Sequence, residues 1–376
     1  MFPSNHARGA LLLALVILAP GSPSPAQSRP AATTRGDGQR RLPRGFLRKT
    51  IALPDGQRRR YAVFVPPQYA LHPEHNWPVI LFLHGSGERG GNGIKQTRIG
   101  LPTIAARHPM KFPFILVMPQ AKDMWFRGSE AAAAWTILDE VHREYRTDRD
   151  RVYLTGLSMG GFGTWELAAR RPDVFAAIVP VCGVAPLPYL SNLVNVPVWA
   201  FHGALDDRVP VSGSRDAVAE LKRLGAEPKY TEYPHVNHFC WDDAYGTPEL
   251  LPWLLKHRRP PPPAVIDYVW PAGRSRVWWL AVEAEAKLKE PARVHVEIQD
   301  GGRVIIESEN TRAWGLVSEA PPLAPGMEIE IVWNKKLIYR GPFEGVLNYT
   351  PPSPARTESR PGGRDDSGSG PPPPQD

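Results

Sequence analysis

RVYLTGLSMGGFGTW, residues 151–165, joins an apolar strand to a helix through a glycine-rich turn. Residues 152–154 are typical of a buried strand, and an apolar-periodic helical segment begins near Phe162. The turn has the G-x-S-x-G pattern of a nucleophile elbow, whose glycines let the backbone expose Ser158 at the carboxyl edge of a sheet. An ordinary glycine-rich strand-to-helix turn is the alternative interpretation. Residues elsewhere in the chain discriminate between the two.

The length and composition of the chain indicate two globular parts. With 376 residues and 42% hydrophobic content, the chain can hold an α/β domain of about 220 residues and a smaller domain. The net charge of +7 and the pI near 9.4 are compatible with a nucleic-acid partner. However, the arginines cluster only at residues 39–48 and 58–60, and no nucleic-acid-binding motif accompanies them. We expect a basic exported protein without a nucleic-acid partner.

The N-terminus has the features of an export signal. Arg8 precedes an apolar run over residues 10–19, and S-P-A at residues 24–26 is a suitable cleavage site. The run is too short to span a bilayer as a stable anchor. We therefore expect residues 1–26 to be a signal peptide, and the mature protein to be secreted or periplasmic.

The region from residue 46 to residue 257 has the pattern of a mainly parallel, doubly wound α/β sheet. Apolar strands alternate with helical segments, which favours a sheet covered on both faces. Functional side chains of such sheets collect at the carboxyl ends of the strands. The expected strands are residues 48–53, 60–65, 77–85, 114–118, 152–155, 176–181, 196–201 and 230–233.

The flanking segments differ from this region in composition. Residues 27–45 are polar and basic and predict a flexible lead-in, and residues 258–264 form a proline-rich linker. Residues 265–349 alternate apolar and polar side chains with period two, which predicts a small all-β domain. Residues 350–376 are rich in Pro, Gly, Ser and charge, and we expect a disordered tail.

An acid and a base for Ser158 follow two later strands. A serine hydroxyl becomes a good nucleophile when a histidine takes its proton and a carboxylate orients that histidine. Asp206 and Asp207 follow the strand at residues 196–201, and the spacing H-G-x-x-D-x-x-V-P favours Asp206. His235 and His238 follow the strand at residues 230–233, and the loop position favours His238. The loops that carry the serine, the acid and the base should all lie at one edge of the sheet. A G-x-S-x-G pattern that arose by chance would have no such acid and base beside it.

Three further histidines are interpreted as outside the catalytic set. His84 and His202 each precede a glycine at a strand end, so we interpret both as structural. His295 falls on an outward-facing position of the β-domain.

An oxyanion hole requires two backbone N–H groups that point toward the developing negative charge. The N–H of Met159, at the start of the elbow helix, and the N–H of Ser86, directly after His84-Gly85, are the two candidates. The glycine-rich loop at residues 86–93 could alternatively cradle a phosphate. It lacks the lysine of a P-loop and the spacing of a dinucleotide fingerprint, so the oxyanion interpretation is favoured.

Seven motifs together resemble the exported α/β-hydrolases grouped as predicted peptidases, phospholipase/carboxylesterases or polyhydroxybutyrate-depolymerase-like esterases. They are L-H-G-S-G-E-R-G (83–90), Q-T-R-I-G-L-P (96–102), V-M-P-Q (117–120), D-R-V-Y-L-T-G-L-S-M-G-G-F-G-T-W (150–165), I-V-P-V-C-G (178–183), F-H-G-A-L-D-D-R-V-P-V-S (201–212) and H-F-C-W-D-D-A-Y (238–245). The resemblance covers residues 46–256 and implies an α/β-hydrolase catalytic domain over residues 46–257. It further implies carboxylic-ester hydrolysis through an acyl-enzyme, with Ser158, Asp206 and His238 as the triad. Two departures, His235 in place of glycine and Cys240 in place of a small polar residue, would reshape the mouth of the site.

Two pairs of side chains near the expected sheet edge leave alternatives open. Cys182 and Cys240 could form a disulfide that holds the histidine loop in an oxidising compartment, or remain two small buried thiols. Trp125 and Trp241 could form an aromatic wall for an aryl or sugar-linked acyl group, or serve only in packing.

The sequence thus predicts a secreted serine esterase that needs no metal ion and no organic cofactor. Its expected partner is a small-molecule or polysaccharide-linked ester, with no stable membrane anchor, and the sequence indicates no oligomeric state. Two alternatives remain: a serine peptidase of the same fold, and a glycan- or wall-binding protein in which a degenerate hydrolase is only a scaffold. A complete Ser, His and Asp set argues against degeneracy.

Overall fold

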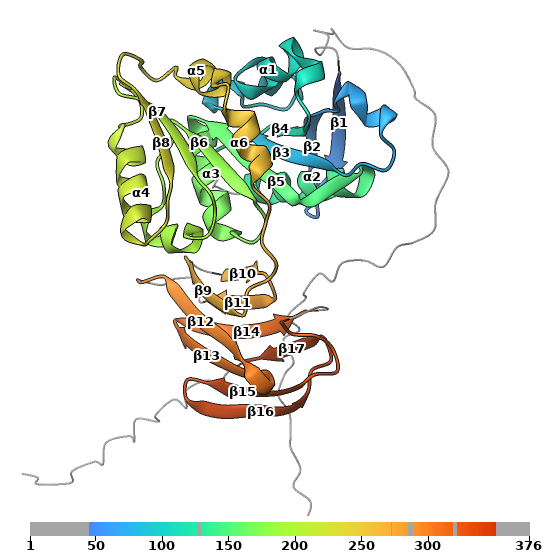
Figure 1. Ribbon diagram of the computed structural model, residues 1–376, viewed down its shortest axis with the longest axis vertical. Helices are drawn as coiled ribbons and strands as arrows, with labels where there is room; N and C mark the ends of the chain where they lie inside the picture. Colours follow the sequence, from blue (N-terminus) through green and yellow to red (C-terminus); the bar gives the residue numbers. More distant parts are fainter. Residues whose placement is uncertain (1–44, 126–128, 272, 285–288, 319–321, 351–376) are drawn as a thin grey trace, which may run out of the picture.

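The computed structural model describes residues 45–125, 129–271, 273–284, 289–318 and 322–350. The expected signal peptide, the lead-in up to residue 44 and the tail from residue 351 lie outside the described residues. Within them, an α/β region is followed by a region built of strands (Figure 1).

The α/β region is built on one eight-stranded sheet in the order β1-β2-β4-β3-β5-β6-β7-β8. Strands β1 and β2 form an antiparallel hairpin, β2 pairs antiparallel with β4, and the other neighbours are parallel. The strands are β1 (Phe46–Ala52), β2 (Arg58–Phe64), β3 (Trp77–Leu83), β4 (Ile115–Pro119), β5 (Thr147–Leu157), β6 (Ala177–Val181), β7 (Trp199–Gly203) and β8 (Lys229–Tyr233). The prediction of a mainly parallel sheet is confirmed.

Helices cover both faces of this sheet, because its central strands are apolar on both sides. In β3, Leu81 packs into a core with helices α2, α3 and α4, whereas the adjacent Phe82 packs into a second core with α1, α5 and α6. The helices are α1 (Leu101–Arg107), α2 (Glu130–Glu144), α3 (Met159–Arg170), α4 (Ser212–Arg223), α5 (Trp241–Gly246) and α6 (Leu250–Lys256). None of the helices in the described ranges is both long and apolar enough to cross a bilayer.

The C-terminal region contains a four-stranded sheet, β10-β11-β14-β17, and a five-stranded sheet, β16-β15-β13-β12-β9. Side chains from both sheets share one core, which includes Trp270, Ile306 and Trp314. The strands are β9 (Val265–Trp270), β10 (Gly273–Val277), β11 (Leu280–Ala284), β12 (Ala292–Gln299), β13 (Arg303–Glu309), β14 (Thr311–Val317), β15 (Glu328–Trp333), β16 (Lys336–Pro342) and β17 (Val346–Tyr349).

The C-terminal region is docked on the α/β region by buried and partly buried hydrogen bonds. The Asn192 side chain donates to the Val269 carbonyl at 2.7 Å and accepts from the Val269 N–H at 2.9 Å. The Tyr268 hydroxyl donates to the carbonyl of Arg170 at 2.7 Å, and the N–H of Trp278 donates to Asp173 at 3.0 Å. The backbone of β9 at Val269 is therefore bound directly to the α/β region.

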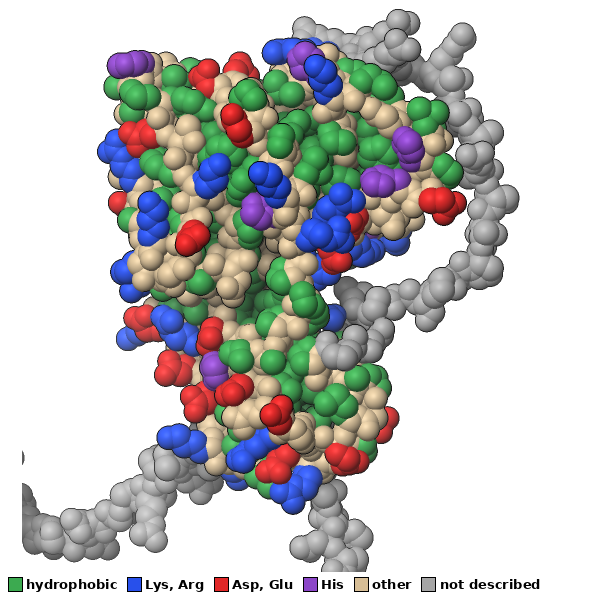
Figure 2. Space-filling view, viewed as in Figure 1, with side chains coloured by type: hydrophobic (Ala, Val, Ile, Leu, Met, Phe, Trp, Pro, Cys, Tyr) green, Lys and Arg blue, Asp and Glu red, His purple; other side chains and the backbone are tan. Residues whose placement is uncertain are grey.

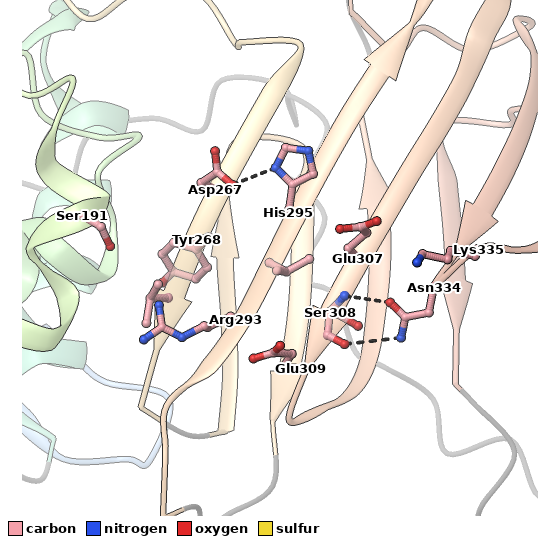
Figure 3. Close-up of a pocket in the computed structure, with 12 residues that line it drawn as sticks. Ser191, Asp267, Tyr268, Arg293, His295, Glu307, Ser308, Glu309, Asn334 and Lys335 are labelled. Carbon is pink, nitrogen blue, oxygen red and sulfur yellow. Dashed lines mark hydrogen bonds and ion pairs between the residues drawn. The ribbon is translucent and has the colours of Figure 1, made fainter. Parts of the chain in front are cut away.

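A pocket of about 610 Å³ lies on the outer face of β9, β12 and β13 (Figure 3). In it, the His295 imidazole lies 2.7 Å from the Asp267 carboxylate through its Nδ1 atom. His295 therefore faces outward, as its place in the period-two pattern predicts. Surface charges of both signs are interspersed on the face that Figure 2 shows.

Candidate active site

Ser158 lies in a strained turn between β5 and α3. Its φ of 52° and ψ of −119° place a non-glycine residue in a region that L-amino acids rarely adopt. The Ser158 N–H donates to the carbonyl of Val181 at 2.9 Å, which holds this conformation. A Cβ atom on Gly160 would overlap the Leu83 carbonyl oxygen, so only glycine allows α3 to start this close to β3.

Three side chains from three loops form one chain of hydrogen bonds. The Ser158 Oγ lies 2.9 Å from Nε2 of His238, and Nδ1 of His238 lies 2.7 Å from Oδ2 of Asp206. The loops follow β5, β8 and β7, so the side chains meet where the parallel strands end. His235 and Asp207 are exposed and lie outside this chain.

The surroundings of Asp206 keep its carboxylate ionised. Burial, the largest influence, would by itself raise its pKa. Hydrogen bonds from the N–H of Val209 at 2.8 Å, from His238 and from the N–H of Arg208 at 2.9 Å outweigh burial and lower the pKa. An ionised carboxylate in this position can orient the His238 ring and stabilise its positive form.

The two predicted oxyanion donors lie at the same sheet edge. Met159 is the first residue of α3, where backbone N–H groups lack intrahelical acceptors. Ser86 opens the single turn η2 (Ser86–Glu88), directly after β3. Beneath this turn, His84 is fully buried, its Nδ1 lies 2.6 Å from the Gly85 carbonyl, and its Nε2 accepts from the N–H of Ala121 at 3.0 Å.

Burial of His84 predicts a pH-dependent stability. Burial lowers its pKa to about 4, below the unfolded value of about 6.5. Between these two pH values, the His84 imidazole binds a proton in the unfolded chain but not in the folded chain. The free energy of unfolding therefore decreases as pH falls from about 6.5 to about 4. We expect a loss of about 3 kcal/mol in the free energy of unfolding from this residue.

Urea unfolding at fixed pH values between 7 and 4 measures this effect. His84→Gln should make the pH dependence shallower by about the same 3 kcal/mol. The exposed His235→Gln should retain the wild-type slope. An equal slope in the wild type and His84→Gln would show that His84 titrates normally in the folded protein.

Of the two alternatives for Trp125, the aromatic wall is wrong, and packing describes the structure. Its side chain is fully buried, and its Nε1 donates to the His84 carbonyl at 2.9 Å, just before the turn η2. Trp241 is 9% exposed and packs edge-on against the His238 ring, with ring centroids 5.7 Å apart. Trp241 therefore packs against His238, and Trp125 packs beneath the end of β3.

The exposed aromatic side chain at the site is Phe239, which the sequence analysis did not assign. It is 49% exposed, and its ring centroid lies 5.9 Å from that of His238 and 5.0 Å from that of Trp241. The Arg208 guanidinium lies 4.8 Å from the Phe239 ring centroid. The sequence contained one indication of this role, namely that an aromatic residue directly follows the expected base, His238.

The disulfide alternative is wrong for this structure, because Cys182 and Cys240 are both free, fully buried thiols. Burial, together with a hydrogen bond to Cys240, raises the pKa of the Cys182 thiol well above its ordinary value. The Cys182 Sγ also accepts from the Ser158 N–H at 3.3 Å. The alternative of two small buried thiols describes the structure.

We expect both thiols to be unreactive in the folded protein. Thiolate is the reactive form, and neither side chain is exposed. A colorimetric disulfide reagent at pH 8 should therefore detect no thiol before denaturation and two thiols after it, without any reductant. Finding no thiol in the denatured protein would establish a bridge instead.

One group in the described part of the chain has the donor set of a metal site. Ligand atoms of Cys182, Asp206 and His238 lie within 4.8 Å of one another. Two of these side chains already bind each other through the 2.7 Å hydrogen bond. A metal ion here would have to displace that hydrogen bond.

Comparisons with known proteins find similarity in the α/β region. Residues 59–187 match the family described as Esterase PHB depolymerase, a stretch that includes Ser86, Ser158 and Met159. A solved structure described as a thermostable esterase is 30% identical, with a TM-score of 0.53 over 58% of this chain and 64% of that chain. The α/β region has the α/β-hydrolase fold. Asp206 and His238 lie beyond the matched stretch, so only the hydrogen bonds connect them to this hydrolase elbow.

Several curated relatives of the hydrolase region are named as esterases, and one of Bacillus subtilis is named as a peptidase. A protein of Nocardia uniformis subsp. tsuyamanensis that is named as an esterase is 28% identical over 46% of this chain and 52% of its own length. Feruloyl esterase B of Neurospora crassa is 30% identical over 34% of this chain and 44% of its own length. The chain thus spans about half the length of these relatives.

Proposed function

We propose that the chain is a secreted serine hydrolase of carboxylic esters that acts through an acyl-enzyme. The observation that carries the proposal is the hydrogen-bonded order Ser158, His238, Asp206 at the carboxyl edge of a parallel sheet. This order supplies a nucleophile, its base and the group that orients the base. The esterase family match to the elbow supports the same chemistry.

In the proposed reaction, the Ser158 oxygen attacks the ester carbonyl while His238 takes the serine proton through Nε2. The N–H groups of Met159 and Ser86 bind the resulting oxyanion, and Asp206 stabilises the protonated His238 ring. His238 then gives its proton to the leaving alcohol, which leaves an acyl group on Ser158. A water molecule, activated by the same histidine, hydrolyses the acyl-enzyme and restores Ser158.

The proposed substrates are short-chain, aryl or carbohydrate-linked esters. Phe239 places a half-exposed ring next to the base, where it can stack on an aromatic group of the ester. The feruloyl esterase among the relatives supports the aryl class. Export rests on the apolar run at residues 10–19 and the cleavage site after it.

A substrate panel and a covalent probe test the proposal. The panel comprises p-nitrophenyl esters of increasing chain length, methyl ferulate, acetylated xylan and a peptide p-nitroanilide. We expect cleavage of esters, with the peptide anilide the poorest substrate, and labelling of the folded protein by a fluorophosphonate. Ser191→Ala, which removes a serine near β9, should label like the wild type.

Two outcomes would overturn the proposal. Faster cleavage of the peptide anilide than of every ester would favour the peptidase alternative. Absence of both labelling and hydrolysis would favour the binding protein with a degenerate hydrolase scaffold.

A further inference from the structure

A second histidine binds the carboxylate of Asp206. His202, the fourth residue of β7, is fully buried, and its Nε2 lies 3.1 Å from Asp206 Oδ2 and 3.1 Å from the Val209 carbonyl. Asp206 Oδ2 is the oxygen that His238 also contacts. The other oxygen, Oδ1, accepts from two backbone N–H groups. The carboxylate of Asp206 therefore has four hydrogen-bond partners.

The partners of His202 determine its tautomer. Both atoms that face Nε2 are acceptors, so Nε2 must carry a hydrogen. Burial is the largest influence on His202 and lowers its pKa, which keeps the ring neutral. A neutral ring with a hydrogen on Nε2 has a lone pair on Nδ1 and needs a donor there. Ser214 in α4, only 1% exposed, supplies it, because its Oγ lies 2.8 Å from Nδ1 and farther, at 3.3 Å, from its other acceptor, the Gly183 carbonyl.

We infer that His202 and Ser214 are positioning residues that hold the Asp206 carboxylate toward His238 during catalysis. Ser214 fixes the His202 tautomer, His202 donates to Asp206 Oδ2, and Asp206 orients the catalytic imidazole. The inference rests on the proposed function, since it gives these two residues a role in the same reaction. It also revises the structural assignment of His202 made from the sequence.

A neutral histidine suits this position for an electrostatic reason. His238 becomes positively charged when it takes the serine proton, and a second positive ring beside Asp206 would oppose that charge. A neutral His202 offers a hydrogen bond without such repulsion. The titratable groups that act on it are Asp206, His238 and Glu232 of β8, and Glu232 is itself paired with Arg215.

Ester hydrolysis by three variants tests the inference against a matched control. His202→Leu removes the donor and should lower kcat about 10- to 100-fold, with KM nearly unchanged, because a hydrogen bond to a charged group is lost. His202→Gln can still donate to Asp206 and should recover most of that loss. Ser214→Ala should lower kcat to an intermediate extent, since the donor to Nδ1 is lost. The control is His142→Gln, which also exchanges a partly buried histidine. The His142 ring lies 2.7 Å from the Thr147 hydroxyl, at the end of β5 opposite to Ser158.

The pH profile separates positioning from a merely structural role. Without the donor from His202, the negative charge of Asp206 interacts more strongly with His238. The acid limb of the kcat/KM profile should therefore move to higher pH in His202→Leu. In the control His142→Gln, the acid limb should stay at its wild-type position. Unchanged kcat and an unchanged acid limb in folded His202→Leu would overturn the inference.

Nitrogen NMR of the wild-type protein provides a test that needs no variant and no catalysis. It should show the hydrogen of His202 on Nε2, and a hydrogen on Nδ1 would contradict the inference even if His202→Leu fails to fold. If the wild-type protein neither hydrolyses esters nor reacts with a fluorophosphonate, the proposed function fails. The NMR result then still decides the hydrogen bonding of His202.

Discussion

Ser158→Ala is expected to lower kcat for p-nitrophenyl acetate about a millionfold. The hydroxyl is the atom that forms the acyl-enzyme, and in the part of the chain that the structure describes Ser158 is the hydroxyl residue that contacts His238 Nε2. A small residual rate should persist, because the oxyanion donors and the binding surface remain. Steady-state hydrolysis with protein purified free of host esterases measures the effect.

The control for this prediction is Ser191→Ala, which also exchanges a serine for alanine but lies in the 3-10 helix η5 (Leu187–Leu193) beside β9. It should retain the wild-type rate. Activity of Ser158→Ala within about tenfold of the wild type would contradict the assignment of Ser158, provided that both variants keep the wild-type circular dichroism.

Asp206→Asn is expected to lower kcat about ten-thousandfold. The amide has no charge to stabilise the protonated His238, and its NH₂ group can hold the imidazole in the wrong tautomer. The backbone donors of Arg208 and Val209 at the other oxygen should keep the side chain in place. The same hydrolysis assay over a range of pH measures the loss.

Asp207→Asn is a matched control, because Asp207 is the exposed neighbour of Asp206 in the same loop. Its kcat should stay within about twofold of the wild type. If Asp207→Asn were the impaired variant and Asp206→Asn were active, the spacing argument and the geometry that selects Asp206 would both be wrong.

The sequence allowed the hydrolase fold and the order of the three site residues to be predicted because both depend on local patterns. The apolar runs of β3, β4 and β6 mark strands that are buried on both faces. Parallel strands end at one edge, so Ser158, Asp206 and His238 could be expected to meet there. The choice of His238 over His235 rested on loop position, and the family resemblance implied the same residue.

The position of Trp125 could not be predicted because it depends on a distant residue. Its side chain lies against α3 at Gly163, where a Cβ atom would come within 2.6 Å of the Trp125 Cβ. The glycine in helix α3 thus leaves space for a tryptophan from a loop that is distant in the sequence. The spacing of residues along the sequence does not indicate this contact. The hydrogen bond between His202 and Asp206 likewise depends on how the loop after β7 turns back.

Strand β5 begins earlier than its apolar pattern predicts. The expected strand at residues 152–155 extends back to Thr147, through residues that include Asp148 and Arg151. These two side chains form an ion pair with 2.7 Å between the charged atoms, so polar residues can continue the strand at the end of the sheet. Apolar periodicity detects only the part of the strand that lies in the core.

The formation of an acyl-enzyme on Ser158 is the central claim, and trapping this species tests it most directly. Wild-type protein is mixed with p-nitrophenyl acetate, quenched in acid within the first turnover and analysed by peptide mass spectrometry. We predict one acetyl group per chain, located on Ser158 and absent when Ser158→Ala is treated in the same way. Rapid ester hydrolysis with the acetyl group on another residue would contradict the account.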